Sequence, residues 1–434
     1  MFETSRERSE TTASSTAHAA PATGAGLGQR DDPPEAGRFA EFFAGIGLVR
    51  EAIEPLGWKC VFANDIAPRK EEMYRRRFGG EHFLLGDIHD LGVGDLPPGL
   101  DLVTASFPCI DLSLAGNRAG LAGRHSGTIW PFLDIVTALC MQRIPPSAVL
   151  LENVTGFLTS RGGADLAKVC RRLAAVDYVI DVLFVDARWF RPQSRPRLFV
   201  VAKQRERGGP WQPADSRPSR VRPAAVRRFE AAHPKLPLVD LPLPAPPAET
   251  TDTLVSVLEN LPPDDSRWWP KDRVAGLVAE MAPPNRCRVK ELLAGERDGV
   301  ATMYRRRRHG RTVGELRPDR LAGCLRTPQG GSSVQFLVDC RSGAPRIRPL
   351  TGREYARLQG ADSFPIKVND RQARLGFGDA VCVQAVRWLV HHAFDSDNRA
   401  ALSASGPFRE TAAVQYPYAP PTSGRDKPQR PLFK

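Results

Sequence analysis

Between residues 38 and 203, short apolar runs alternate with stretches in which apolar residues recur at helical spacing. The first run, 38–43, is followed by apolar residues that lie on one face of a helix, from Leu48 to Leu56. Strands that alternate with helices favour crossover connections, which build a mainly parallel sheet with helices on both faces. We therefore predict an α/β fold with a doubly wound sheet, in which ligands bind beyond the carboxyl ends of the strands.

The same pattern predicts the individual elements and their grouping. Strands are expected at 38–43, 58–62, 82–85, 101–105, 148–151, 179–185 and 197–202, and helices at about 48–56, 68–78, 128–142, 163–175 and 379–391. Residues 204–320 break this rhythm, because prolines cluster there and the apolar periodicity is weak. We expect a first domain over 38–203, a smaller irregular domain over 204–374, and a helical segment over 375–395 that returns to the first domain.

Composition limits the class of protein. No stretch of the 434 residues approaches the roughly 18 consecutive apolar residues of a membrane span, and the N-terminus has no apolar segment of a secretory signal. The eight cysteines are scattered without a zinc-binding spacing, so we expect reduced thiols, no metal and a cytoplasmic protein. The segments 1–37 and 403–434 are poor in large apolar residues, which predicts disordered tails.

A net charge of +12 suits a partner rich in phosphate, such as a nucleic acid. A general compositional bias toward arginine explains the same charge equally well. Charge alone therefore does not choose between these two interpretations.

The first predicted strand ends in a glycine-containing turn, Phe43-Ala44-Gly45-Ile46-Gly47. Glycines at this place let the backbone approach a ligand closely at the start of a helix. Acidic residues follow the next two strands, at Asp65 and Asp87, where they can accept hydrogen bonds from ribose hydroxyls. Arg50 stands where the third glycine of the dinucleotide fingerprint would fall, which disfavours NAD or FAD and makes S-adenosylmethionine the leading candidate. An ordinary tight turn is the alternative.

Reactive side chains lie at the ends of two further strands and just before a third. Cys109 comes directly after the strand at 101–105, and Glu152 lies at the end of the strand that begins at Ala148. A carboxylate at a buried strand end is unfavourable unless it is paired or protonated, which makes Glu152 a candidate general acid. Arg195 and Arg197 alternate in an extended segment and thus point to the same side. Each residue has a simpler interpretation, since most single cysteines are small buried apolar residues.

Taken together and in order, these motifs resemble those of the DNA cytosine-5 methyltransferase family. The matching segments are FFAGIG, FPCIDLS, ENV, QSRPR, RPLTGREYARLQG and GDAV, and the resemblance covers about 38–395, most weakly across 204–320. It implies that 38–203 is a Rossmann-like catalytic domain that binds S-adenosylmethionine, and that 204–374 is a target-recognition domain.

The resemblance also implies a role for each reactive residue. Cys109 is expected to add to C6 of a cytosine that has been flipped out of the duplex, and Glu152 to protonate N3 of that base. Arg195, with Arg197 behind it, is expected to hold the cytosine carbonyl. The implied cofactor pocket consists of Phe43, Ala44, Gly45, Gly47, Asp65, Ile66, Asp87, Ile88, Pro108, Ile129, Asp379 and Ala380. Asp379 stands where the family usually has asparagine, which leaves the contact of that motif open.

In this family the region between QSRPR and RPLTGREYARLQG selects the sequence that is methylated. Arg326 and Gln329 are side chains that can recognise guanine or adenine edges, whereas Arg305 and Arg306 suit phosphate contacts. A solvated basic surface is the alternative for the run at 305–308. The complete set of expected DNA contacts is Ser113, Arg305, Arg306, Arg326, Thr327, Gln329, Gly330 and Gly331.

We therefore predict a monomeric bacterial enzyme that methylates double-stranded DNA, as the modification half of a restriction system whose endonuclease acts independently. Two alternatives stay open: a tRNA cytosine-5 methyltransferase, and a DNA-binding protein with an inactive site. A dehydrogenase is disfavoured by Arg50.

Overall fold

The computed structural model describes residues 37–112, 120–205, 212–308, 310–326 and 334–394. All of them belong to one compact unit, residues 36–434. Almost all of the predicted N-terminal tail and the whole predicted C-terminal tail lie outside the described residues. Gly37 was expected in the N-terminal tail, but it is the first residue of a strand.

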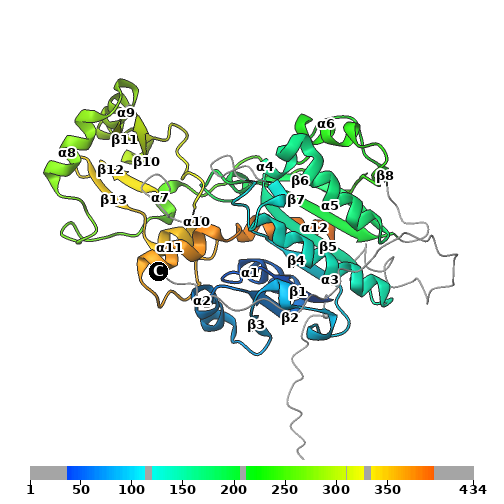
Figure 1. Ribbon diagram of the computed structural model, residues 1–434. Helices are drawn as coiled ribbons and strands as arrows, with labels where there is room; N and C mark the ends of the chain where they lie inside the picture. The colour runs from blue at the N-terminus through cyan, green and yellow to red at the C-terminus, as the bar shows by residue number, and fades with distance from the viewer. Residues whose placement is uncertain (1–36, 113–119, 206–211, 309, 327–333, 395–434) are drawn as a thin grey trace, which may run out of the picture. The chain divides into compact units, whose positions relative to one another are not determined.

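Seven strands form one sheet in the order β3-β2-β1-β4-β5-β7-β6 (Figure 1). They are β1 (Gly37–Phe42), β2 (Trp58–Asp65), β3 (Phe83–Leu85), β4 (Leu102–Ala105), β5 (Ala148–Val154), β6 (Tyr178–Asp186) and β7 (Pro196–Gln204). Only β7 runs antiparallel to its neighbours in this sheet. The chain passes from β1 outward to β3 and then returns to β4 beside β1, so the switch point at which such sheets bind ligands lies at the ends of β1 and β4.

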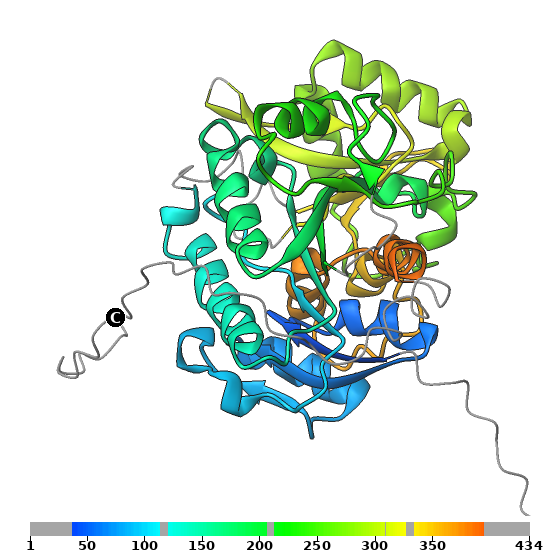
Figure 2. The ribbon, with the colours of Figure 1, turned by 90° about the vertical axis from the view of Figure 1, so that its right-hand side faces the viewer.

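Helices cover both faces of this sheet, as Figure 2 shows with the teal helices α3 and α5 on one side and the orange α12 on the other. The strands are buried on both faces: Phe39 of β1 packs with α1, α2 and α12, while Phe42 packs with α3 and α5. This arrangement explains the nearly continuous apolar strands. The helices in this part are α1 (Leu48–Ile53), α2 (Pro68–Phe78), α3 (Ile129–Met141), α4 (Gly156–Thr159), α5 (Ala164–Ala174), α6 (Ala224–Ala232), α7 (Leu254–Val257) and α12 (Val383–Ala393).

The region without predicted elements contains a smaller antiparallel sheet in the order β11-β10-β12-β13. Apolar residues of α8 and α9 pack against it in a core of its own. The elements are α8 (Lys271–Glu280), α9 (Pro283–Leu293), β10 (Val300–Arg308), β11 (Arg311–Leu316), β12 (Phe336–Asp339) and β13 (Arg346–Pro349), and a two-stranded pair is formed by β8 (Gln212–Pro213) and β9 (Val239–Asp240). The sequence pattern missed β10 because its first residues are buried and its last ones are exposed arginines, without alternation.

The helix predicted at 379–391 was placed too early. Asp379 is the last residue of α11 (Asp370–Asp379), and α12 begins only at Val383. Between the two helices, Ala380 is extended, and its carbonyl accepts hydrogen bonds from Arg195 and Gln359 at 2.6 and 3.0 Å. A carbonyl that is turned toward these side chains cannot continue a helix, which explains the break.

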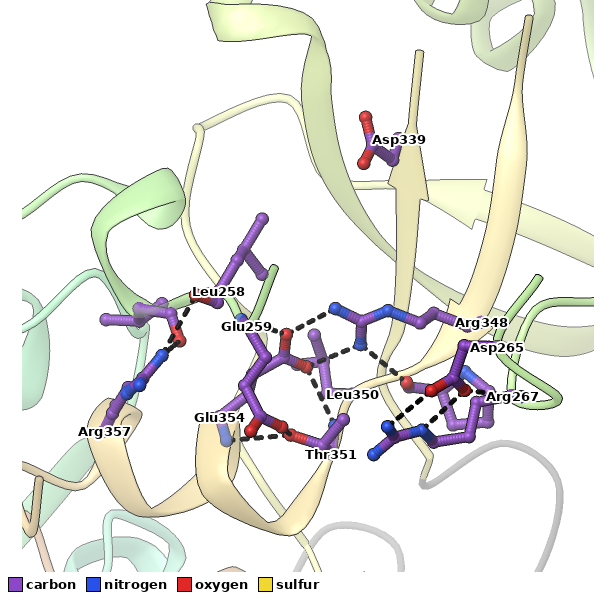
Figure 3. A network of polar contacts seen from close by, with 12 residues as sticks. Leu258, Glu259, Asp265, Arg267, Asp339, Arg348, Leu350, Thr351, Glu354 and Arg357 are labelled. Carbon is purple, nitrogen blue, oxygen red and sulfur yellow. Dashed lines mark hydrogen bonds and ion pairs between the residues drawn. The ribbon is translucent and has the colours of Figure 1, made fainter. Parts of the chain in front are cut away.

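A buried ion pair joins β13 to α10 (Gly352–Leu358), as Figure 3 shows. Arg348 and Glu354 are both fully buried, and Arg348 Nη1 donates to Glu354 Oε2 at 2.7 Å. The carboxylate of Glu354 also accepts from the backbone amides of Thr351 and Glu259, at 2.8 and 2.9 Å. Arg348 thus pairs with Glu354 through both terminal nitrogens of its guanidinium, and this buried, hydrogen-bonded pair fixes β13 to α10. The domain boundaries at 203 and 374 remain predictions.

Candidate active site

The turn after β1 is fixed to the end of β2 by Asp65. One carboxylate oxygen of Asp65 accepts from the amide of Gly45 and the other from the amide of Ala67, both at 2.8 Å. Phe43, Gly45 and Gly47 all have positive φ, at 54°, 59° and 83°. Phe43 is a non-glycine residue in this strained region, so the contacts of the turn must hold it there.

The two glycines of the turn have different uses. A Cβ atom on Gly45 would meet no atom closer than 3.9 Å, so this backbone is open toward the edge of the sheet. A Cβ atom on Gly47 would lie 2.5 Å from Phe78 and 2.8 Å from Tyr74. Gly47 therefore serves the packing of α1 on α2, whereas Gly45 leaves room for a ligand, as does the half-buried Phe43.

Asp87 follows β3 and begins the short 3-10 turn Ile88–Asp90. Hydrogen bonds from the backbone and the ring of His89 hold the pKa of Asp87 below its usual value. The neighbouring apolar residues differ in burial, since Ile88 is 4% exposed and Ile66, after β2, is 63% exposed. Ile66 therefore presents a large apolar side chain to solvent directly after Asp65.

These features fit the nucleoside part of S-adenosylmethionine. Asp65 and Asp87 offer carboxylate acceptors for hydroxyl groups, and Ile66 offers an apolar surface to a ring. Gly45 and Gly86 leave space, because no atom comes within 4 Å of a Cβ placed on Gly86. The residues present thus fit a nucleoside cofactor at the switch point.

The remaining expected pocket residues are placed unequally. Ala44 is buried, with only 6% of its surface exposed, and Pro108 is half-buried. Ile129 is fully buried in the core at the start of α3. Ala380 directs its carbonyl toward Arg195. Asp379 forms an ion pair with Lys70 of α2, whose Nζ lies 3.0 Å from Asp379 Oδ2.

Cys109 lies in the loop after β4, and two contacts tie this loop to the end of β5. Asn153 Nδ2 donates to the carbonyl of Phe107 at 3.0 Å. A Cβ atom on Gly156 would lie 2.3 Å from the carbonyl of Leu112, so only glycine permits this close approach. Burial raises the pKa of Cys109 above its usual value, and the nearby charges of Arg197 and Arg195 only partly offset this effect.

Glu152 of β5 pairs with Arg197 of the adjacent strand β7. Arg197 Nε lies 2.9 Å from Glu152 Oε1, and the two side chains are only 14% and 11% exposed. The antiparallel register places Arg197 opposite Val154, so Glu152 and Arg197 are diagonal neighbours on the same face. Burial by itself would lower the pKa of Arg197, but the interactions with Cys324 and then with Glu152 outweigh burial and raise this pKa.

The structure gives the two arginines different partners. The expected arrangement, with Arg195 at the cytosine carbonyl and Arg197 behind it, stays a prediction, and in the structure Arg197 is the arginine that pairs with Glu152. Arg195 is 2% exposed, and its guanidinium donates to the carbonyls of Leu325, Gly378 and Ala380. The reason is geometric: Arg195 precedes β7, where these three carbonyls face it, whereas Arg197 lies within the strand beside β5.

Cys324 contacts both arginines and was not singled out from the sequence. Its Sγ lies 3.6 Å from Arg195 Nη1 and 3.8 Å from Arg197 Nη1. Burial alone would raise the pKa of this thiol, but the two guanidinium groups outweigh burial and hold it below its usual value. Lys70 was missed as well, because nothing in its local sequence distinguishes it from the other charged residues of α2.

The expected DNA contacts fall into three groups. Arg326 and Arg306 are exposed. Arg305 instead packs over the rings of Phe336 and Trp269, with its guanidinium carbon 5.0 and 5.8 Å from their centroids. The others lie outside the described residues: Ser113, Thr327, Gln329, Gly330 and Gly331.

The described part of the chain offers neither a metal site nor a membrane-spanning helix. Across 37–394, apart from the gaps named above, no group of three or more His, Cys, Asp or Glu residues is placed to hold a metal ion. In the same residues, no helix is long and apolar enough to cross a membrane.

Comparison with known proteins agrees with this geometry. The chain is 30% identical over 355 residues to the Type II methyltransferase M.DsaV of Dactylococcopsis salina, covering 81% of this chain and 84% of that protein. It is 28% identical to the Type II methyltransferase M.NlaX of Neisseria lactamica, covering 85% of this chain and 97% of that protein.

The fold also matches that of a solved methyltransferase. The crystal structure of the S. pombe Dnmt2 methyltransferase superimposes with a TM-score of 0.53 at 18% identity, over 82% of this chain and 97% of that one. The sequence profile of the C-5 cytosine-specific DNA methylases matches residues 37–394. The sheet is therefore the Rossmann-like sheet of S-adenosylmethionine-dependent methyltransferases, and the chain belongs to the C-5 cytosine-specific DNA methylase family.

Proposed function

We propose that this protein methylates C5 of cytosine within a short, specific sequence of double-stranded DNA. The observation that carries the proposal is the arrangement at the switch-point edge of the sheet. There, Arg197 Nε lies 2.9 Å from Glu152 Oε1, and the charges of both side chains act on the thiol of Cys109. A nucleophile, a carboxyl group and a fixed cation at one strand edge are the groups that addition to an electron-poor ring requires.

Cys109 is the proposed nucleophile. Its sulfur adds to C6 of the cytosine, and the electron pair of the C5–C6 double bond becomes available at C5. Burial favours the neutral thiol, so the thiolate must form when the substrate is in place, with the charge of Arg197 favouring it. A base removes the C5 proton after methyl transfer, and the Cys109–C6 bond then breaks to free the enzyme.

Glu152 is the proposed group that recognises the cytosine. Its carboxyl hydrogen-bonds the Watson–Crick edge and delivers a proton to N3, which relieves the negative charge as sulfur adds to C6. Arg197 orients this carboxyl through their ion pair. Arg195 acts as a positioning residue, because its guanidinium holds the backbone at 325, 378 and 380.

S-adenosylmethionine, when bound, supplies the electrophilic methyl group. Phe43, Asp65, Asp87 and Ile66 are the residues that we expect to hold its nucleoside part. A cytosine that is stacked in a duplex cannot be approached by Cys109 from its ring face, so the base must be flipped out before the reaction.

We further propose that the protein is the modification enzyme of a restriction system, that it acts as a monomer in the cytoplasm, and that the cognate endonuclease acts independently. The named relatives support the first part, since both are Type II methyltransferases. In such a system the methylated sequence is protected against the endonuclease.

The test is transfer of a labelled methyl group from S-adenosylmethionine to plasmid DNA, followed by bisulfite sequencing. We expect protected cytosines within one short motif. A parallel assay on tRNA separates the alternative, because incorporation into tRNA and not into duplex DNA would overturn the proposal. Absence of incorporation into both, with folded protein, would favour a DNA-binding protein with an inactive site.

A further inference from the structure

Lys70 lies among the residues of the cofactor edge although it belongs to none of the motifs. Its Nζ is 3.0 Å from Asp379 Oδ2, and its Cδ is 4.0 Å from the point where a Cβ of Gly45 would stand. Its electrostatic neighbours are Asp379, Asp65 and Cys109. A single lysine therefore lies beside the open turn after β1 and pairs with Asp379, and its charge interacts with the acid after β2 and the thiol after β4.

This position is costly for an ammonium group. The side chain of Lys70 is only 29% exposed, and burial by itself would lower its pKa. The negative charges of Asp379 and Asp65 and the hydrogen bond to Asp379 outweigh burial, so the pKa of Lys70 is raised and the group stays charged. The edge thus contains one fixed positive and one fixed negative charge side by side, both partly open to solvent.

The amino-acid end of the cofactor has the complementary pair of charges, a carboxylate and an ammonium group. The proposed ribose contact, Asp65, lies at the end of β2, and the proposed site of reaction, Cys109, lies at the end of β4. Lys70 and Asp379 interact electrostatically with that thiol, whereas Asp87 follows β3, which is separated from β4 by β2 and β1 in the sheet. The proposed nucleoside contacts lie after β2 and β3. The charged amino-acid part of the cofactor is therefore expected near the ends of β1 and β4.

We propose that Lys70 and Asp379 recognise the amino-acid end of S-adenosylmethionine, the ammonium of Lys70 binding its carboxylate and the carboxylate of Asp379 binding its ammonium. The inference rests on the function proposed above. It predicts that these two residues determine how strongly the protein distinguishes a complete cofactor from one without the amino acid.

Calorimetric titration of the full-length protein with two ligands tests this inference. S-adenosylhomocysteine carries the amino-acid end, and 5′-methylthioadenosine lacks it. Lys70→Met is expected to weaken binding of S-adenosylhomocysteine about tenfold, the loss typical of one charged hydrogen bond, and to leave binding of 5′-methylthioadenosine unchanged. Lys59→Met, at an exposed lysine near the start of β2, is the matched control and should change neither.

A purely structural ion pair would behave differently. It would lower the affinity for both ligands equally or for neither, and either result overturns the inference. The charge swap Lys70→Asp with Asp379→Lys restores the pair but sets each charge against a like charge, so the melting temperature should recover while the affinity for S-adenosylhomocysteine does not. If the folded wild-type protein binds neither ligand, the proposed function itself fails.

Discussion

The two sheets of this protein hold their arginines in opposite ways. In the seven-stranded sheet, Arg195 is buried and Arg197 is half-buried, and each is fixed by several partners. On the four-stranded sheet, Arg306 and Arg308 of β10 are 51% and 56% exposed and share the single carboxylate of Glu315. The first arrangement suits groups that must be held for a reaction, and the second suits charges that adapt to a phosphate backbone.

The difference has an energetic consequence. A buried charge loses its hydration, so removal of its partner leaves a large uncompensated penalty. An exposed pair is screened by water and salt and contributes little. We therefore expect substitutions at the first site to act strongly and specifically, and those on β10 to act weakly and uniformly.

Loss of the nucleophile should have the largest effect. Cys109→Ser is expected to reduce methyl transfer about a thousandfold or more, because a serine hydroxyl at neutral pH is a much weaker nucleophile than a thiolate. DNA binding in a gel-shift assay should persist. Cys287→Ser, at the exposed cysteine of α9, is the control and should be fully active. Turnover by Cys109→Ser at the wild-type rate would exclude the proposed chemistry.

The next largest effect is expected at the buried ion pair between β13 and α10. Glu354→Gln leaves the fully buried charge of Arg348 without its partner, so we expect a loss of about 3–5 kcal/mol in the free energy of unfolding. Glu72→Gln removes an exposed pair with Arg76 and should change that free energy by less than about 1 kcal/mol. Urea denaturation of both variants measures the contrast, and equal losses would contradict it.

Arg195 and Arg197 should have different roles, the first structural and the second chemical. Arg195→Met removes the Arg195 donor from the carbonyls of Leu325, Gly378 and Ala380, of which the last keeps its hydrogen bond from Gln359, and is expected to lower the free energy of unfolding by about 2–4 kcal/mol. Arg197→Met releases Glu152 and should lower kcat about a hundredfold while KM for the cofactor is kept.

Measurement of kcat and of the melting temperature for both variants decides which arginine acts in the reaction and which one stabilises the fold. If Arg195→Met impaired only kcat and Arg197→Met impaired only stability, the arrangement expected from the sequence would be correct.

Sequence predicted the large sheet well because its pattern is local. Most strands there are mainly apolar runs, and the reactive residues lie close to strand ends. The strand predicted at 148–151 continues in the structure through Glu152, Asn153 and Val154. Glutamate and asparagine are polar, so the sequence did not indicate that this part of the strand is buried.

What the sequence could not predict depends on contacts between distant residues. Cys324 meets Arg195 and Arg197 across more than a hundred positions, and Lys70 meets Asp379 across about three hundred. No periodicity or spacing carries such information. The small sheet was missed for a related reason, since β10 and β12 pair across a long connection and neither alternates in polarity.

A further prediction concerns Glu41, a buried acidic residue near the end of β1. Both of its carboxylate oxygens lack a hydrogen-bond partner among the described residues, and burial raises its pKa from 4.5 to about 8. The unfolded chain therefore loses this proton at lower pH than the folded protein does. Between pH 4.5 and about 8, wild-type stability should fall by about 1.4 kcal/mol per pH unit from this group.

Glu41→Gln removes the titrating group, so its advantage over the wild type should grow as pH rises through that range. Urea denaturation between pH 5 and pH 8 measures it, and Glu81→Gln, at an exposed glutamate, should show no such trend. An advantage that stays constant with pH would show that Glu41 is ionised throughout, with a partner that stabilises it.

The smallest effects are expected on β10. Arg306→Ala should weaken DNA binding equally for sequences that contain the methylated motif and for those that do not, and lower the slope of log affinity against log salt by about 1. Arg326 is a side chain that we expect to recognise base edges, so Arg326→Ala should instead reduce the preference for the motif, by about 1–3 kcal/mol. Filter binding at several salt concentrations distinguishes the two. A loss of sequence preference in Arg306→Ala would mean that β10 takes part in base recognition, and the contrast between fixed and adaptable arginines would then no longer separate chemistry from recognition.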